Sequence, residues 1–175
     1  MISTNVKGIC EKGFSLVETL ITLAVMSILL GLATLEFSKW IVKYDIESQT
    51  QELYSKLQIT RVQALHRNTR HYFQLERNGY SISASSSPFD FGSGESDSGD
   101  VVIAPYKQLR HPVDRGSVIK FDHRGLVPLN QARTICIPSD VNPDFDCIVI
   151  HRVRINMGKI KRQGEACVAT NCRVK

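Results

Sequence analysis

The chain has 175 residues, which is enough for one membrane anchor and one domain of modest size but not for several domains. Its formal net charge is +5, from 22 Lys and Arg residues against 17 Asp and Glu residues. The two signs are separated along the chain: residues 85–100 contain four acidic and no basic side chains, whereas residues 107–175 contain 13 basic and six acidic ones. We therefore expect an acidic loop and a basic C-terminal region on separate surfaces.

An apolar run with a single charge, Glu18, extends over residues 14–35. A helix of this length spans roughly 33 Å, enough to cross a bilayer. Lys7 and Lys12 precede the run, and basic flanks stay on the cytoplasmic side, so we expect residues 36–175 to be exported. Glu18 needs an explanation, because an acidic residue at the centre of an inserted helix costs roughly 2.5–3.5 kcal/mol.

Two ordinary interpretations of this run are incomplete. A secretory signal peptide has an apolar core of about 7–15 residues followed by a small-residue cleavage site. Here the core is longer, and it continues into Glu36-Phe37-Ser38-Lys39-Trp40 without such a site. A plain single-pass anchor explains the length but leaves Glu18 unexplained.

The segment Gly13-Phe14-Ser15-Leu16-Val17-Glu18 resembles the processing site of type IV prepilins. The resemblance implies that a prepilin peptidase cuts between Gly13 and Phe14 on the cytoplasmic side, and that the new Phe14 amine is then methylated. It also implies that the apolar helix stays in the protein as anchor and assembly stalk. Glu18 would then pair with the N-terminal amine of a neighbouring subunit, which offsets the cost of burying both charges.

The helical pattern continues beyond the apolar run. Ile46, Leu53, Leu57 and Ala64 recur at spacings of seven, four and seven, which places them on one helix face. We expect one continuous helix over about residues 14–68, and we expect this stripe to pack on a sheet as domain core. The predicted organisation is a leader (1–13), a membrane-spanning helix (14–35), an amphipathic extension (36–68) and a β-rich domain (69–175).

The β-rich domain begins with a hairpin signal, because the runs 72–76 and 80–83 flank Asn78-Gly79. Residues 85–100 are rich in Ser, Gly and Asp and are expected to form a mobile loop. Further strands are predicted at 101–104, 117–121, 134–137, 147–155 and around 159–161, with a turn at 122–125. The sum is an α+β fold in which one long helix packs on an antiparallel sheet.

Three later segments resemble the FimT/GspH group of minor pilins and pseudopilins: residues 118–125, Gly158-Lys159-Ile160-Lys161, and the helix end at 61–68. This resemblance implies a subunit of a type IV pilus or of a type II secretion pseudopilus. Its implied partners are other pilin subunits and the prepilin peptidase. Its implied location is the bacterial inner membrane, with the C-terminal domain in the periplasm.

Five cysteines cannot all pair in disulfides, which is unusual for an exported protein, but Cys10 lies in the leader. Its removal leaves Cys136, Cys147, Cys167 and Cys172, an even set suited to disulfides in an oxidising compartment. Three pairings are possible, and proximity in sequence favours Cys136–Cys147 and Cys167–Cys172. A metal site is the alternative, although no Cys-x-x-Cys or His pair accompanies these residues.

The sequence offers no catalytic constellation and no motif for a cofactor. The five histidines are scattered, the Ser85-Ser86-Ser87 run has loop composition, and no glycine-rich phosphate loop is present. We therefore expect a protein that is not an enzyme.

A basic set in the C-terminal region suggests a second function, DNA binding. Lys159, Lys161 and Arg162 follow a predicted strand that carries Arg152 and Arg154. Some FimT-type pilins take part in DNA uptake through a Gly-Arg-x-Arg motif, and here Lys159 and Lys161 stand in place of the arginines. Lysine keeps the charge but lacks the bidentate fork, so contacts would be to backbone phosphates. A solvated basic strand is the competing interpretation.

Overall fold

The computed structural model describes residues 13–85, 101–128 and 132–174, with the side chains of residues 32–36 left out. The predicted leader, apart from Gly13, and the predicted loop, apart from Ser85, lie outside the described residues. The chain divides into two compact units, Met1–Trp40 and Ile41–Lys175, which are considered separately here.

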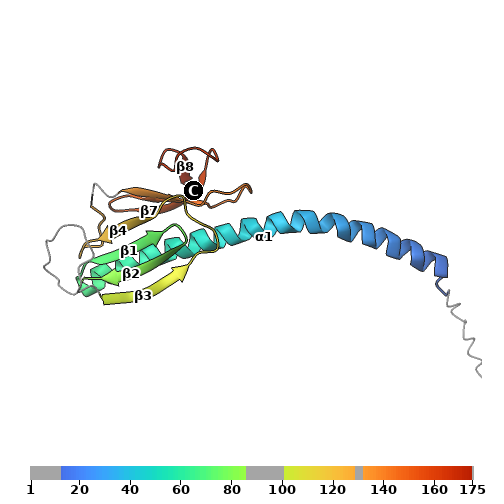
Figure 1. Cartoon of the computed structure of the whole chain (residues 1–175), viewed down its shortest axis with the longest axis horizontal. Helices are drawn as coiled ribbons and strands as arrows, with labels where there is room; N and C mark the ends of the chain where they lie inside the picture. Colours follow the sequence, from blue (N-terminus) through green and yellow to red (C-terminus); the bar gives the residue numbers. More distant parts are fainter. Residues whose placement is uncertain (1–12, 86–100, 129–131, 175) are drawn as a thin grey trace, which may run out of the picture. The chain divides into compact units, whose positions relative to one another are not determined.

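One helix and eight strands form the described structure (Figure 1), which confirms the α+β prediction. Their bounds are α1 Leu16–Arg67, β1 His71–Glu76, β2 Gly79–Ala84, β3 Val101–Gln108, β4 Ser117–Phe121, β5 Arg133–Cys136, β6 Cys147–Ile150, β7 Ile155–Ile160 and β8 Cys172–Val174. The predicted helix bounds agree with α1 to within two residues. Asn68 ends the helix with a φ of 53°, the left-handed conformation that Asn tolerates at a helix C-terminus.

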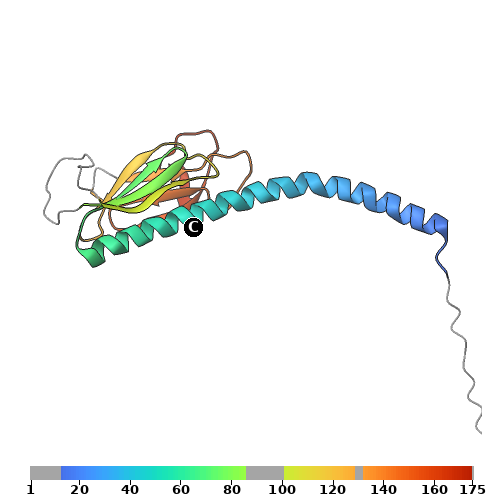
Figure 2. The same cartoon turned by 60° about the horizontal axis from the view of Figure 1, so that its bottom comes forward.

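The strands form two antiparallel sheets of four strands each. Sheet A has the order β3-β2-β1-β4, and sheet B has the order β5-β6-β7-β8. Within the Ile41–Lys175 unit, strands of both sheets lie beside the C-terminal part of α1 (Figure 2). The sequence pattern predicts this packing but a single sheet, whereas the structure has two.

The predicted stripe of α1 is the centre of the core. Ile46, Leu53, Leu57 and Ala64 are each at most 1% exposed. They share one apolar cluster with side chains from both sheets, among them Phe73 and Ile148. Each large side chain buried in this way stabilises the fold by about 1.5–3 kcal/mol, so the stripe fastens both sheets to the helix.

Polar contacts fix the position of the helix against the loops. Gln49 pairs with the backbone of His111 through both its amide atoms, at 2.7 and 2.9 Å. Thr50 Oγ1 donates to the carbonyl oxygen of Phe145 at 3.2 Å, and the Glu47 carboxylate accepts from the amide of Asp144 at 2.6 Å. These buried or half-buried bonds specify where along the helix the sheets lie.

Three details of the β-domain differ from the predictions. The hairpin is present, but its register pairs Glu76 with Gly79, so the turn residues are Arg77 and Asn78. Gly79 is instead the first residue of β2, and this position requires glycine because the ring of Tyr106 occupies the space that a Cβ atom would need. The predicted strand over 147–155 is two strands, β6 and β7, and β8 was not predicted at all.

His71 is a buried titratable group in sheet A. It is 0% exposed, its Nδ1 lies 3.2 Å from the carbonyl oxygen of Thr69, and its Nε2 has no hydrogen-bond partner among the described residues. Burial lowers the pKa of His71 below 6.5; the Thr69 carbonyl opposes this shift and the Arg67 charge adds to it. The folded state therefore binds the proton less readily than the unfolded state does.

We predict that the free energy of unfolding falls as pH is lowered below about 6.5, because the unfolded chain then gains the proton on His71 first. Replacing His71 with Leu should flatten this part of the profile, as measured by thermal unfolding between pH 7.5 and 5. The matched control is His66→Gln, since His66 is exposed. An unchanged acid slope in the His71→Leu variant would contradict the assignment.

Candidate functional site

The predicted processing site lies just before α1. Residues 13–15 are not helical, α1 begins at Leu16, and Phe14 is 80% exposed. The Gly13–Phe14 peptide bond therefore lies in a non-helical, accessible stretch, as a peptidase substrate requires. After a cut at this bond the new amine would stand two residues from the start of the helix.

Glu18 lies in the first turn of α1 and is exposed. Its carboxylate makes no hydrogen bond or ion pair with another described residue. A carboxylate in the first turn interacts favourably with the helix dipole, but this effect amounts to about 0.3–1 kcal/mol. That is less than the roughly 2.5–3.5 kcal/mol that an acidic side chain costs at the centre of an inserted helix. The helix start alone does not explain Glu18.

The helix around Glu18 carries a continuous exposed apolar surface, which we call the apolar stalk surface. Its large side chains are between 51% and 80% exposed: Phe14, Leu16, Val17, Leu20, Ile21, Leu23, Val25, Met26, Ile28, Leu29 and Leu30. Within the described part of the chain, we find no helix with both the length and the apolar character of a membrane span. Covering eleven such side chains would still contribute on the order of 15–30 kcal/mol of transfer free energy, and an apolar patch this large marks an interaction surface.

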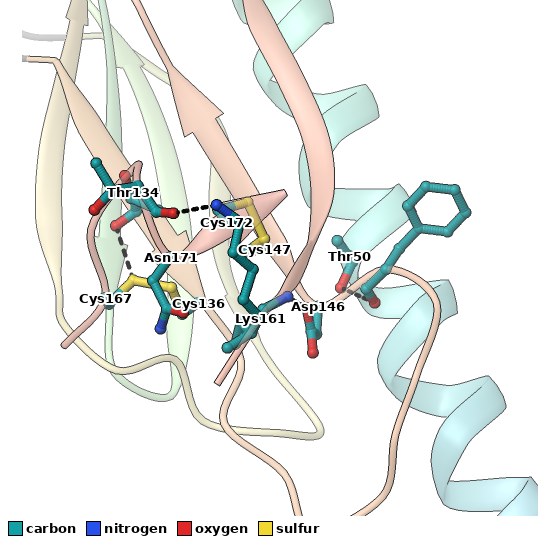
Figure 3. Close-up of a disulfide and its surroundings, with 12 residues drawn as sticks. Thr50, Thr134, Cys136, Asp146, Cys147, Lys161, Cys167, Asn171 and Cys172 are labelled. Carbon is teal, nitrogen blue, oxygen red and sulfur yellow. Dashed lines mark hydrogen bonds between the residues drawn. A yellow bond between two sulfur atoms is a disulfide. The ribbon is translucent and has the colours of Figure 1, made fainter. Parts of the chain in front are cut away.

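The cysteines form two disulfides that differ from the predicted pairing (Figure 3). The bonds are Cys136–Cys167 and Cys147–Cys172. Cys136 and Cys147 are indeed neighbours, as directly opposite residues of β5 and β6. Their side chains stand side by side on one face of sheet B, and the C-terminal segment crosses that face and brings Cys167 and Cys172 to them. The pairing by proximity was therefore wrong, and the alternative of a metal site is excluded for these four residues.

The second disulfide requires a glycine beneath it. The Cα atoms of Cys147 and Cys172 are 6.1 Å apart although β7 lies between their strands, whereas two strand spacings amount to about 9.5 Å. β8 therefore bends over the face of β7. A Cβ atom on Gly158 would collide with the carbonyl group of Arg173 and lie 2.9 Å from Cys172 Sγ. Gly158, part of the segment that resembles the pilin motif, thus has a packing role.

Asp146, which directly precedes β6, connects that strand with the end of β7 through its buried carboxylate. It is 0% exposed, and its carboxylate accepts from the amide of Ile160 at 2.6 Å and from Gln163 Nε2 at 3.1 Å. Burial raises the pKa of Asp146, while the hydrogen bonds and the charge of Lys159 partly oppose the shift. This carboxylate anchors the segment that follows β7, where Lys161 and Arg162 lie.

The structure separates the predicted basic set into two groups. Arg152 and Arg154 are exposed in the turn between β6 and β7, not on a strand as predicted. Lys159 lies five residues beyond Arg154, which is about 17 Å along an extended strand. Lys161 Nζ donates to the carbonyl oxygen of Thr170 at 2.7 Å, and Arg162 Nη1 pairs with Glu165 at 3.0 Å. The side chains of Lys161 and Arg162 are therefore already bonded to neighbouring segments of the chain.

The remaining cation, Lys159, lies opposite a second cation that the sequence did not point to. Arg173 on β8 lies directly opposite Lys159 on β7, and both line a groove of about 600 Å³. Like charges directly opposite each other destabilise a sheet, so this pair would gain from an anion bound across it. The strand β8 has only three residues, one of them the disulfide-bonded Cys172, and its pairing was therefore not visible in the sequence.

Comparison with known proteins identifies the N-terminal region only. A profile for the prokaryotic N-terminal methylation motif matches residues 10–34. No curated protein and no solved structure matches the chain. The matched residues contain Gly13, Phe14 and Glu18, and the motif is the type IV prepilin-like signal. It supports a type IV pilin-like protein that is processed by prepilin peptidase and is associated with a membrane or a pilus.

We predict that Gly158→Ala destabilises the β-domain by about 1–3 kcal/mol, because the added methyl group has to displace β8. Thermal unfolding of the oxidised protein measures the change. Gly31→Ala is the matched control, since a Cβ atom there meets nothing within 4 Å. Equal stability of the Gly158→Ala variant and the parent protein would show that β8 does not bend over β7 as described.

Proposed function

We propose that this chain is a minor pilin or pseudopilin of the FimT/GspH kind, a low-abundance subunit that takes part in assembling a type IV pilus or a type II secretion pseudopilus, at its tip. Prepilin peptidase would remove residues 1–13, and Phe14 would be N-methylated. The observation that carries the proposal is the methylation motif over residues 10–34, at the start of an exposed apolar helix. The role is structural, so the chain is not an enzyme.

In this scheme the apolar stalk surface has two successive environments. Before assembly, residues 14–35 hold the subunit in the inner membrane as a single pass, with the C-terminal domain in the periplasm. During assembly the same surface packs on the helices of other subunits. One apolar surface serves both states, because lipid and neighbouring helices both remove it from water.

Glu18 gives this assembly its register. Its carboxylate would meet the Phe14 amine of a neighbouring subunit, and the pair would neutralise two charges that are costly to bury singly. Only a subunit at the correct axial position brings these two groups together. The exposed, unpaired state of Glu18 in the described chain is consistent with a partner that another subunit supplies.

We predict that Glu18→Gln leaves the protein processed but lowers its recovery in sheared filaments at least about tenfold, because one buried charge loses its partner. Immunoblots of the membrane and filament fractions measure both effects. Glu76→Gln is the matched control, since Glu76 is exposed on the β-domain. Wild-type recovery of the Glu18→Gln protein in filaments would rule out the pairing.

DNA binding is the second candidate function, and the Lys159–Arg173 groove favours it. Backbone phosphates could bridge these two opposed cations, whereas Lys161 and Arg162 are engaged within the chain. Each phosphate contact contributes about 0.9 to the slope of log K against log salt. A salt-dependent affinity with a slope near two is therefore expected from this groove.

We predict that alanine at both Lys159 and Arg173 weakens binding of the full chain to duplex DNA and lowers the salt slope by about two. Fluorescence anisotropy at several salt concentrations measures the slope. The control pair is Arg152→Ala with Arg154→Ala, at the other end of β7. If the control pair lowers the slope and the groove variant does not, the groove is not the DNA contact.

A further inference from the structure

A second cavity lies at the opposite end of sheet B from the Lys159–Arg173 groove. Its volume is about 280 Å³, and it is bordered by the starts of β4 and β5, the end of β6 and the segment that follows Cys167. We call it the Arg115–Arg133 pocket. Its lining residues are Arg115, Ser117, Ala132, Arg133, Thr134, Val149, Ile150, His151, Cys167, Val168 and Ala169.

The two formal charges of this pocket, on Arg115 and Arg133, are both positive. His151 also lines it, and no acidic side chain is among its described lining residues. Arg133 and His151 form no ion pair or side-chain hydrogen bond with another described residue. Arg115 Nε forms an exposed ion pair with Asp114 at 3.9 Å, a distance too long for a hydrogen bond. Two guanidinium groups with unused donors thus border one cavity.

A disulfide and buried strand residues hold the walls of the pocket in place. The Cys136–Cys167 disulfide ties the segment 167–169 to the end of β5. Val149 and Ile150 are at most 2% exposed and supply a rigid apolar floor. Ser117 and Thr134, both half-buried, add hydroxyl groups at the starts of β4 and β5. The disulfide and the buried floor fix the backbone around the cavity, whereas the Arg115 side chain is 87% exposed and Arg133 is also exposed, so a bound ligand has to order both side chains at an entropic cost.

We propose that the Arg115–Arg133 pocket binds an oxyanion group of side-chain size, a carboxylate or a phosphate. Planar guanidinium groups match the paired oxygens of such groups and hold them by charge-assisted bidentate hydrogen bonds. The volume lies just below the range of about 300–1,000 Å³ that accommodates drug-sized ligands, which favours a single acidic group over a longer molecule. This inference is independent of the proposed pilin function, because it uses none of the N-terminal residues.

The test uses the full chain in detergent micelles, titrated separately with inorganic phosphate and with glutarate at constant ionic strength. Backbone amide NMR shifts report the site. We expect saturable shifts confined to residues 132–134, 149–151 and 167–169 with at least one of the two ligands. Saturation by phosphate alone identifies a phosphate site, saturation by glutarate alone a carboxylate site, and saturation by both a general oxyanion site.

Two substitutions decide whether the guanidinium groups act as inferred. Arg133→Met keeps the aliphatic stem and should raise the dissociation constant at least fivefold, and Arg115→Ala provides a second, independent variant. The control is Arg77→Ala, on the exposed hairpin turn of sheet A. The proposal is overturned if no shift saturates, if both pocket variants bind like the parent, or if the shifts also involve Lys159 and Arg173 to the same extent.

Discussion

The apolar stalk surface of α1 is the constraint on which the remaining interpretation depends. The helix continues without a break from Leu16 to Arg67, yet its two parts differ in whether their apolar side chains are buried. Residues 41–67 present one stripe, and the sheets of the same chain cover it. Residues 14–30 carry eleven large apolar side chains, and the described chain leaves all of them exposed. In the proposed function lipid or other subunits cover these side chains, and Glu18 would be the polar group that distinguishes a specific neighbour from an arbitrary apolar environment.

The C-terminal segment is held by covalent and polar bonds rather than by apolar packing. Most residues beyond Ile160 are exposed, so little hydrophobic free energy fixes β8. The two disulfides close sequence separations of 31 and 25 residues, and each stabilises the fold by about 3.5 kcal/mol in the chain-entropy model. Because the two loops overlap, these contributions are not additive. The Lys159–Arg173 groove and the Arg115–Arg133 pocket both include residues that this bonded segment supplies, so both depend on an oxidising compartment.

Much of the fold could be predicted because its signals are local. The stripe at Ile46, Leu53, Leu57 and Ala64 defines a helix face, and the hairpin of β1 and β2 follows from short-range patterns. The disulfides could not be predicted, since their pairing depends on how the C-terminal segment crosses sheet B. The pairing of Arg173 with Lys159 was likewise not visible in the sequence, because the strand of Arg173 has only three residues. The split between β6 and β7 was missed because Val153 continues the β-branched composition of these strands through the turn.

The central claim is that the chain is cut between Gly13 and Phe14 and that the cut creates the group that Glu18 meets. Mass spectrometry of the N-terminus of the protein purified from its native membrane tests this claim most directly. The predicted result is a chain that begins with N-methylated Phe14 and lacks Cys10, with four cysteines in two disulfides. An intact leader, or a mature chain that begins at any other residue, would contradict it.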